Sequence, residues 1–290
     1  MASPPEQSAS GWASGLLGVI ILSGSLPATR VAVADFSPLF LTSARAVIAA
    51  VLGAVLLVIL RQKRPARADL VPLAIVAGGV VLGFPLLTAL ALQHITSAHS
   101  IVFIGLLPLA TAIFGVLRGG ERPQPVFWLF SVLGALSVAC FALAQGGTAS
   151  LTGDLLMLAA IVLCGLGYAE GASLSRKLGG WQVISWALIL SLPVMAVLAV
   201  ITLPGTFAGV GAPAWLGLGY VSVFSMLVGF VFWYRGLALG GIAGVSQLQL
   251  LQPFFGLVLA GLLLGEPVSW LMIAASAVVV GCVAGAKRFA

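Results

Sequence analysis

Charged residues are scarce in this chain. Its 290 residues include 13 Lys or Arg and 7 Asp or Glu, only 7% of the total, whereas a soluble domain averages about 25% charged residues. Hydrophobic residues make up 61%, and the mean hydropathy is +1.21. A surface this poor in charge is not that of a water-soluble enzyme or regulator. The composition predicts an all-helical protein surrounded by the lipid bilayer, with no charged domain outside it.

Cysteine and histidine are also few, and none is arranged for metal or redox chemistry. Cys140, Cys164 and Cys282 stand alone in apolar runs, and His94 and His99 are five residues apart, so they do not share a helical face. We therefore expect free thiols, no metal site and no cofactor. The sequence also lacks a Ser/His/Asp set, an HExxH motif and paired aspartates, so an intramembrane transferase is the weakest of the alternatives, and no enzyme activity is expected.

Long hydrophobic runs are abundant and predict about ten membrane spans of roughly 20 residues each. The first eleven residues lack the basic start of a cleavable signal peptide, so the first span is expected to remain as an anchor. The expected spans are 12–33, 37–60, 70–92, 96–117, 124–145, 154–175, 182–203, 214–236, 241–263 and 268–286.

The basic residues fall mainly on one set of connections between these spans. If the amino terminus lies in the cytoplasm, the cytoplasmic side holds Arg61, Lys63, Arg64, Arg67, Arg118, Arg122, Arg176, Lys177, Arg235, Lys287 and Arg288. The opposite connections hold only Arg30. This bias predicts an inner-membrane protein with both termini in the cytoplasm. It also explains the net charge of +6 without a nucleic-acid partner.

One pattern occurs twice, half a chain apart. Pro108 is followed thirteen residues later by Glu121, and Pro253 thirteen residues later by Glu266, with a glycine before each glutamate. The offset between the copies is 145 residues. Duplication on this scale in an apolar chain is typical of secondary transporters. We interpret both prolines as hinges, because a proline within a span interrupts the helix, and both glutamates as helix caps.

The duplication divides the chain into two repeats, 1–146 and 147–290. Five spans per repeat is an odd number, so the second repeat must enter the membrane in the opposite sense to the first. We expect two inverted five-helix repeats around a central cavity, acting as one transport unit. Ten helices can enclose a pathway without a partner subunit, so we expect a monomer.

These features resemble the EamA repeat of the drug/metabolite transporter superfamily. The resemblance rests on the two proline and Gly-Glu elements, on Ser37–Arg45 at the start of the second span, and on Gly153–Ala160 with Ser175–Leu178 around the sixth. Within the family the chain is most similar to YddG-type exporters of aromatic amino acids. The resemblance implies ten helices, a cavity that opens alternately to either side, and export of small metabolites or drugs.

Polar side chains on two spans are candidate cavity residues, because such groups normally face the interior of a membrane protein. Thr96, His99, Ser100 and Phe103 share one helical face that leads to Pro108. Ser246, Gln249 and Gln252 share a face that leads to Pro253. We predict that both sets line the pathway and bind substrate; the alternative is that they hydrogen-bond between helices.

Aromatic and charged residues complete the predicted site. Phe84, Phe103, Tyr168 and Trp186 are candidates for stacking against a planar substrate. Arg45, about seven residues and roughly 10 Å into its span, either holds a substrate carboxylate or pairs with Asp154 or a backbone carbonyl. Glu170 either couples transport to protons or reaches the membrane interface.

The predicted function is alternating-access export of small neutral metabolites, most of all aromatic and other neutral amino acids. A multidrug pump for hydrophobic cations is the main alternative, and it would need a carboxylate at the centre of the membrane, for which Glu170 is the candidate. The sequence leaves open whether an ion drives transport.

Overall fold

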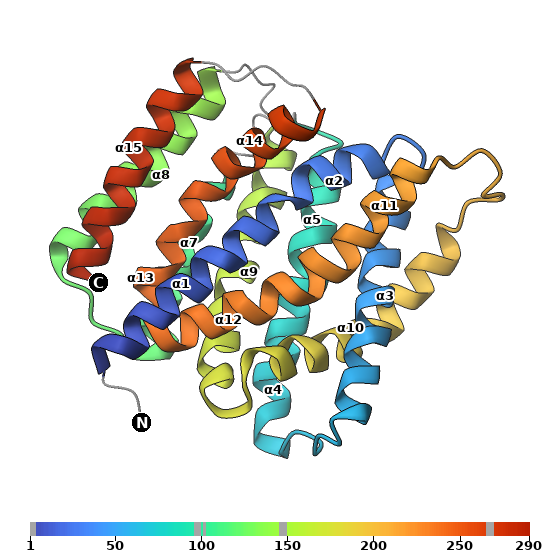
Figure 1. Cartoon of the computed structure of the whole chain (residues 1–290), viewed down its shortest axis with the longest axis horizontal. Coiled ribbons are helices and arrows are strands. Elements are labelled where there is room, and N and C mark those ends of the chain that lie inside the picture. The colour runs from blue at the N-terminus through green and yellow to red at the C-terminus, as the bar shows by residue number, and fades with distance from the viewer. Residues whose placement is uncertain (1–3, 96–99, 101–102, 145–149, 265–269) are drawn as a thin grey trace.

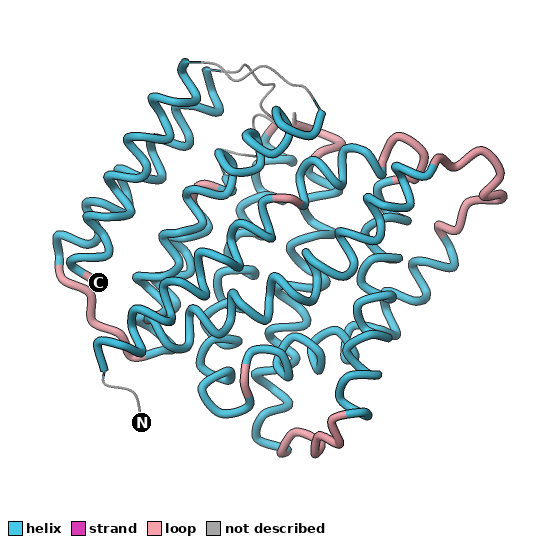
Figure 2. Tube along the Cα trace, viewed as in Figure 1, coloured by secondary structure: helices cyan, strands magenta, loops and turns pink. Residues whose placement is uncertain are grey.

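The computed structural model of the protein describes residues 4–95, 100, 103–144, 150–264 and 270–290, and in these residues all regular structure is helical. Figure 2 shows short loops between long helices, and one longer loop between the two helices at the upper right. The helices are α1 (Pro4–Ser23), α2 (Ser25–Ala32), α3 (Pro38–Ile59), α4 (Arg67–Val76), α5 (Phe84–Ala91), α7 (Leu107–Gly119), α8 (Pro125–Ala144), α9 (Leu151–Leu178), α10 (Gly180–Ile201), α11 (Ala212–Tyr220), α12 (Gly229–Gly240), α13 (Ile242–Ser246), α14 (Gln252–Leu264) and α15 (Trp270–Phe289).

Three helical segments depart from α geometry and connect these helices end to end. The π-helical segment η1 (Ala77–Gly83) joins α4 to α5, and a second one, η2 (Val221–Val228), joins α11 to α12. The 3-10 segment η3 (Gln247–Leu251) joins α13 to α14. Such irregular turns locally change the direction of a helix and are often found at functional sites.

Within the described residues, seven continuous helical stretches are long and apolar enough to cross a membrane. They are Ala9–Ala32, Pro38–Ile59, Arg67–Ala91, Leu151–Leu178, Gly180–Ile201, Ala212–Gly240 and Ile242–Leu263. Leu107–Gly119 and Pro125–Phe141 are shorter apolar helices. The multi-pass membrane architecture expected from the sequence is therefore present, whereas the count of ten spans and the inversion between repeats stay predictions.

Local sequence explains where α3 begins. The hydroxyl of Ser37 accepts a hydrogen bond from the amide of Phe40 at 3.3 Å, and Pro38 occupies the first turn. Both are common at helix starts, because the first amides of a helix lack an acceptor within it and proline has no amide hydrogen. The 22 residues of α3 then rise by about 33 Å, enough to cross the hydrocarbon core of a bilayer.

The two matched prolines begin helices and do not lie inside them. Pro108 is the second residue of α7, which follows a turn at residues 105–106. Pro253 is the second residue of α14, which follows the 3-10 segment η3. A turn thus precedes Pro108, whereas Pro253 follows a change from 3-10 to α geometry within the stretch Ile242–Leu263. The proposed role of both residues as hinges remains a prediction.

Glycines allow some helices to approach closely, and α1 against α12 is the clearest case. A Cβ atom on Gly236 would lie 2.5 Å from the Cα of Gly15, and one on Gly11 would lie 2.2 Å from the backbone nitrogen of Gly240. Small residues have this role between membrane helices, where packing replaces the hydrophobic effect. In Figure 1, α1 and α12 cross the middle of the molecule, with α8 and α15 paired at one edge and α3 and α10 at the other.

Large apolar side chains cover the outside of this bundle. Val58, Leu216 and Leu262 are each more than 70% exposed. In water such a surface would cause aggregation, whereas in a bilayer it faces lipid tails. The exposed apolar belt therefore agrees with the membrane location that the composition predicts.

Candidate functional site

A central cavity of about 280 Å³ lies between the two halves of the chain. Its lining from the first half is Leu22, Ser23, Ser25, Thr29, Phe84, Thr88, Ile104 and Leu107, and from the second half Tyr168, Gln249, Gln252 and Pro253. The walls are mainly apolar, with hydroxyl and amide groups placed among them. A cavity with this chemistry suits a small molecule that has an apolar body and a few polar groups.

Aromatic rings close the central cavity on the side of α12. Tyr168 is 5% exposed, and its ring centre lies 5.7 Å from that of Trp233 and 6.1 Å from that of Phe230, both of which are buried. Tyr234 packs against the same ring at 6.4 Å. Such tilted and edge-on contacts are the preferred arrangement of aromatic pairs and make a rigid wall.

A larger vestibule of about 560 Å³ adjoins the central cavity, and the two share Thr29, Phe84 and Thr88 in their linings. The vestibule continues past Arg45 to Gln93 and Thr202, near the connections that follow α5 and α10. The shared lining residues indicate a route from the centre of the protein to this end.

Arg45 projects into the vestibule without a protein partner. It lies two turns into α3, its Nε atom is buried without a hydrogen bond, and the described residues provide neither a hydrogen bond nor an ion pair for the guanidinium. The predicted pairing with Asp154 or a backbone carbonyl is therefore wrong. The alternative that the sequence left open, contact with a substrate, is taken up below.

The opposite end of the protein, which we call the basic end, is closed by contacts between the two halves. It contains the α3–α4 connection, the end of α7, the α9–α10 connection and the junction of α12 with α13, which lie along the lower part of Figure 1. These segments hold most of the Arg and Lys residues. The linings of the central cavity and the vestibule include none of their residues.

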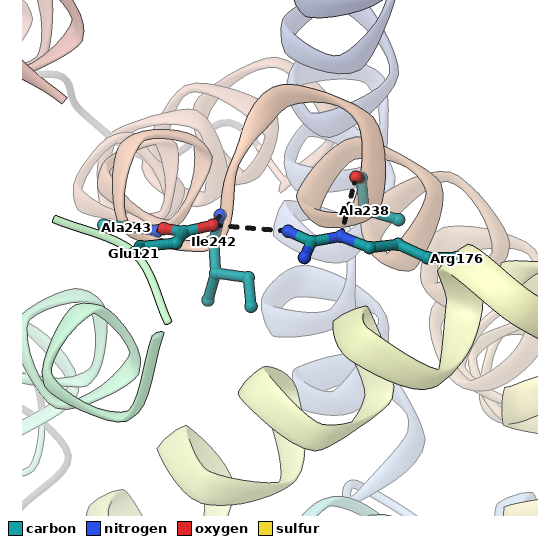
Figure 3. Close-up of polar contacts among 5 residues, drawn as sticks. All are labelled: Glu121, Arg176, Ala238, Ile242 and Ala243. Atoms are coloured by element: carbon teal, nitrogen blue, oxygen red, sulfur yellow. Dashed lines mark hydrogen bonds and ion pairs between the residues drawn. The ribbon is translucent and has the colours of Figure 1, made fainter. Parts of the chain in front are cut away.

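Glu121 forms the most connected link at the basic end. Its carboxylate accepts hydrogen bonds from the backbone amides of Ile242 at 2.6 Å and Ala243 at 2.7 Å (Figure 3). These are the first two residues of α13, which has no cap from its own chain neighbour Gly241. A carboxylate there satisfies orphan amides and the positive end of the helix dipole. Glu121 thus caps a helix in the other half of the chain, and not, as the sequence predicted, a helix that begins at Glu121 itself.

Two glycines make this geometry accessible. Gly120 ends α7 with φ of 68°, and Gly241 precedes α13 with φ of 92°. Residues with a side chain rarely adopt positive φ, whereas glycine does so readily. The turn at Gly120 directs Glu121 toward α13, and a Cβ atom on Gly241 would already lie 3.7 Å from Oε1 of Glu121.

Arg176 extends the link from Glu121 to α12. Its Nη2 atom lies 3.4 Å from Oε1 of Glu121, and its Nε donates to the carbonyl of Ala238 at 3.2 Å (Figure 3). Ala238 lies in the last turn of α12, where carbonyl groups lack partners within the helix. One arginine therefore joins the end of α12, the cap of α13 and its own helix α9.

Two further ion pairs cross between the halves at this end. Lys177 of α9 donates to both carboxylate oxygens of Asp69 in α4, at 2.7 and 2.8 Å. Arg118 of α7 pairs with Glu170 of α9. In each pair the acidic side chain is 8% exposed and the basic one more than 50%, so the carboxylates are the groups that depend on their partners. Glu170 is thus held in a pair and does not line either cavity.

The cavities contain some of the predicted substrate-binding residues. Phe84, Tyr168, Gln249 and Gln252 line the central cavity. Neither cavity is lined by the other predicted residues that the structure describes, Ser100, Phe103, Trp186 and Ser246. Their predicted contact with substrate remains a prediction, as does that of His99, which lies outside the described residues with Thr96 and Glu266.

Ser246 illustrates the alternative role of a polar residue in a span, which is to form hydrogen bonds between helices. Its hydroxyl is fully buried and bonds with the carbonyl of Ala243 at 2.8 Å and that of Pro108 at 3.2 Å. It thereby joins α13 to the start of α7, which is the helix-packing role that the sequence left open.

Several cavity residues were not predicted, and most come from the first span and the third. Ser23, Ser25 and Thr29 surround Pro27, and Thr88 follows Phe84 by one helical turn. The cluster of hydroxyls next to a proline in an otherwise apolar span was the available signal. Thr88 had none, since it stands alone in an apolar run.

Together the membrane-spanning helices and a route with mainly apolar walls and a few polar groups are the features of a membrane transporter. The model of the EamA-like transporter family matches the chain twice, at residues 9–143 and 151–286, and the chain belongs to this family. The resemblance stated from the sequence is thereby confirmed at the level of the family.

The chain is similar to curated relatives and to solved structures. YdeK of Bacillus subtilis (strain 168), described as an uncharacterized transporter, is 66% identical over 285 residues, 98% of this chain and 99% of the relative. A probable terminal-alkyne amino-acid exporter of Streptantibioticus cattleyicolor is 24% identical over 255 residues, 87% of this chain and 84% of that protein. A crystal structure described only as that of a protein shares the fold with a TM-score of 0.81 and 19% identity, covering 96% of this chain and 99% of the other.

Proposed function

We propose that the protein exports small neutral metabolites, foremost aromatic and other neutral amino acids, by alternating access. In this proposal ten spans form two inverted five-helix repeats, and the cavity between them opens first to one side and then to the other. The observation that carries the proposal is the central cavity itself, which both halves line and which shares lining residues with a vestibule at the end opposite the basic end.

The orientation follows from charge. The basic end holds most of the Arg and Lys residues, so by the positive-inside rule it faces the cytoplasm of the inner membrane, together with both termini. The structure then represents the state that is closed to the cytoplasm and open to the outside. To accept a substrate from the cytoplasm, the links of Glu121, Lys177 and Arg118 must break while the vestibule closes. We expect a monomer to be sufficient, since one chain supplies both walls of the cavity.

The cavity chemistry supports an amino acid as substrate. Phe84 and Tyr168 offer aromatic faces, and Oε1 of Gln249 is a buried acceptor without a partner, suited to an ammonium group. The Streptantibioticus cattleyicolor relative, named as a probable exporter of an amino acid, agrees with this class. We therefore favour the family's amino-acid exporters, and among them the YddG type that the sequence resembles.

The alternative of multidrug efflux has less support. A pump for hydrophobic cations needs a carboxylate near the bound charge. The described residues that line the two cavities include no Asp or Glu, and the candidate Glu170 is paired with Arg118 outside both cavities. Arg45 is the charged group present, and it disfavours a cation.

An intramembrane transferase has still less support. It would need a nucleophile beside a base, and the described lining residues include no His, Cys, Asp or Glu. Hydroxyl groups of Ser and Thr are present there, but without such a base they are weak nucleophiles.

Counterflow in proteoliposomes tests the proposal. Vesicles are preloaded with unlabelled phenylalanine, and entry of labelled phenylalanine is followed without any ion gradient. We expect transient accumulation that saturates and that tryptophan blocks, since a carrier exchanges substrate across both faces. Threonine and alanine are tested in parallel. If none of these amino acids accumulates, the result would favour drug or cation export instead.

A pair of matched variants connects this transport to the cavity. Gln249→Leu removes the unpartnered acceptor from the cavity and should reduce counterflow of phenylalanine about tenfold. Gln124→Leu makes the same exchange at an exposed position before α8 and should leave transport unchanged. Equal effects of both variants would contradict the assignment of the central cavity as the substrate site.

A further inference from the structure

Arg45 is a charged group that lines the vestibule and has no hydrogen bond or ion pair with the residues that the structure describes. The Nε atom is buried and makes no hydrogen bond, and of the three guanidinium nitrogens it alone is fully enclosed without a partner. The two terminal nitrogens also have no bonding partner in the described residues, and the side chain is part of the vestibule lining. An unpaired cation within a membrane span is unfavourable, and such residues usually mark a functional site.

Among the described residues that line the two cavities, none carries a negative charge that could neutralise Arg45. No Asp or Glu occurs in the described lining of the vestibule or the central cavity. The vestibule wall beside it has the hydroxyls of Ser37, Thr42 and Thr88, and the Thr88 oxygen is itself buried without a partner. Two unsatisfied polar side chains thus face one cavity, and a small anion between them would satisfy both.

The remaining walls indicate what is attached to that anion. Phe84, Leu39 and Leu92 line the vestibule, and Phe84 also lines the central cavity. A ligand with an apolar or aromatic body can therefore lie along Phe84 while its anionic end reaches Arg45. Arginine suits a carboxylate in particular, since its planar fork forms two parallel hydrogen bonds to the two oxygens.

We propose that Arg45 is the carboxylate-binding residue of the transporter, at a subsite in the vestibule that a substrate occupies between the central cavity and release. This inference rests on the proposed function and deepens it, because it makes a carboxylate with an apolar body the required substrate chemistry. Thr88 supports the same carboxylate through its hydroxyl. The subsite selects against amines and amides of the same shape.

The test compares ligands that differ only at the carboxylate. Purified protein in detergent is titrated with phenylalanine, phenylalanine amide, phenethylamine and 3-phenylpropionate, and binding is measured from ligand-induced thermal stabilisation. We expect the two carboxylates to bind about tenfold or more tightly than the amide and the amine, because a charge-assisted bidentate contact is lost in the latter. This comparison uses the unmodified protein and does not depend on any variant folding.

Variants then assign the preference to Arg45. Arg45→Gln should reduce the ratio between acid and amide to within about twofold, and Arg45→Lys should keep part of it, since the charge remains without the fork. Arg30→Gln is the matched control, because Arg30 is an exposed arginine at the same end and does not line the vestibule. It should preserve the full ratio.

Specific results would overturn the inference. These are equal binding of acid and amide by the unmodified protein, an Arg45→Gln variant that weakens all four ligands to the same degree, or no stabilisation by any of them. Inorganic phosphate is titrated as a further ligand. If phosphate stabilises the protein as well as 3-phenylpropionate does, and only when Arg45 is present, Arg45 is a general site for anions or lipid headgroups.

Failure of this inference is distinguishable from failure of the proposed function. Counterflow of phenylalanine with an unchanged acid-to-amide ratio in Arg45→Gln would retain the amino-acid carrier and reject the subsite. Arg45-dependent binding of 3-phenylpropionate without counterflow of any neutral amino acid would retain the subsite and assign the transporter to carboxylates that are not amino acids.

Discussion

The two ends of the protein are held together by different chemistry. At the basic end the halves are joined by carboxylates and basic groups, centred on Glu121, Asp69 and Glu170. At the vestibule end the contacts between the halves include hydrogen bonds from the hydroxyls of Ser25 and Tyr220, and an exposed hydrogen bond from the amide of Gly211 to the carboxylate of Asp35. We infer that the charged links keep the basic end shut, and we expect these hydroxyl and amide contacts at the vestibule end to be weaker.

A pair of cysteine reporters makes this contrast measurable. Ser246 is fully buried next to the Glu121 link, and Thr88 lines the vestibule. In a protein without its native cysteines, Ser246→Cys reports opening of the basic end and Thr88→Cys reports access to the vestibule. The rate of reaction with a membrane-impermeant maleimide is the readout in each prediction below.

Loss of Glu121 should have the largest effect. Glu121→Ala leaves the amides of Ile242 and Ala243 without an acceptor, and loss of a cap of this kind costs about 1–2 kcal/mol. We expect the labelling rate of Ser246→Cys to rise about tenfold and transport to fall by a similar factor. Glu121→Gln keeps one acceptor oxygen and should have a smaller effect. An unchanged labelling rate in Glu121→Ala would show that the link does not hold the end shut.

Loss of Arg118 should come second. Arg118→Gln leaves the Glu170 carboxylate, whose side chain is 8% exposed, without its partner, and an unpaired buried charge is unfavourable. We expect a rise in Ser246→Cys labelling of about fivefold, returning to within about twofold of the starting rate when Glu170→Gln is added. Glu170→Gln alone should retain transport. Complete loss of transport in that single variant would instead support Glu170 as a coupling group.

Loss of Asp69 should have a modest effect. Lys177 is 58% exposed, and pairs with one exposed partner contribute about 0–1 kcal/mol. Asp69→Asn should therefore raise Ser246→Cys labelling about twofold to threefold, and high salt should reduce the difference from the unmodified protein. A salt-independent effect of tenfold or more would contradict the ranking of the links.

Loss of Asp35 should have the smallest effect. Asp35 lies at the vestibule end, so its variant is compared with the variants at the basic end. Its hydrogen bond to the amide of Gly211, 2.8 Å long, is exposed to solvent, so water can replace it. We expect Asp35→Asn to change labelling of Thr88→Cys by less than about twofold. A change as large as that of Glu121→Ala would mean that the two ends are tied equally strongly.

The sequence predicted the membrane helices, the duplicated proline and Gly-Glu elements, and the family. These follow from composition and spacing, which are properties of the chain itself. It predicted that Glu121 caps the helix that it begins, since a carboxylate at a helix start can satisfy free amide groups. It did not indicate that the helix Glu121 caps is α13, more than 100 residues away, because that depends on how the halves pack.

The sequence predicted only part of the cavity lining, because the lining also depends on how the two halves pack. Gln249 and Gln252 line it as their helical spacing indicated, but Ser246 on the same face bonds with Pro108 instead. A 3-10 segment between residues 247 and 251 alters the angle between these side chains, and the α-helical period did not anticipate it. For Arg45 the sequence left contact with a substrate and pairing with a protein group both open, because the choice depends on which groups the fold brings to the guanidinium.

The central claim is that closure of the basic end and opening of the vestibule are opposite phases of one motion. The most direct measurement is the labelling rate of Ser246→Cys and Thr88→Cys, each with and without Glu121→Ala. We predict that Glu121→Ala raises labelling at Ser246→Cys and lowers it at Thr88→Cys, because opening one end closes the other. A rise at Ser246→Cys with unchanged labelling at Thr88→Cys would contradict the claim and show that the two ends open independently.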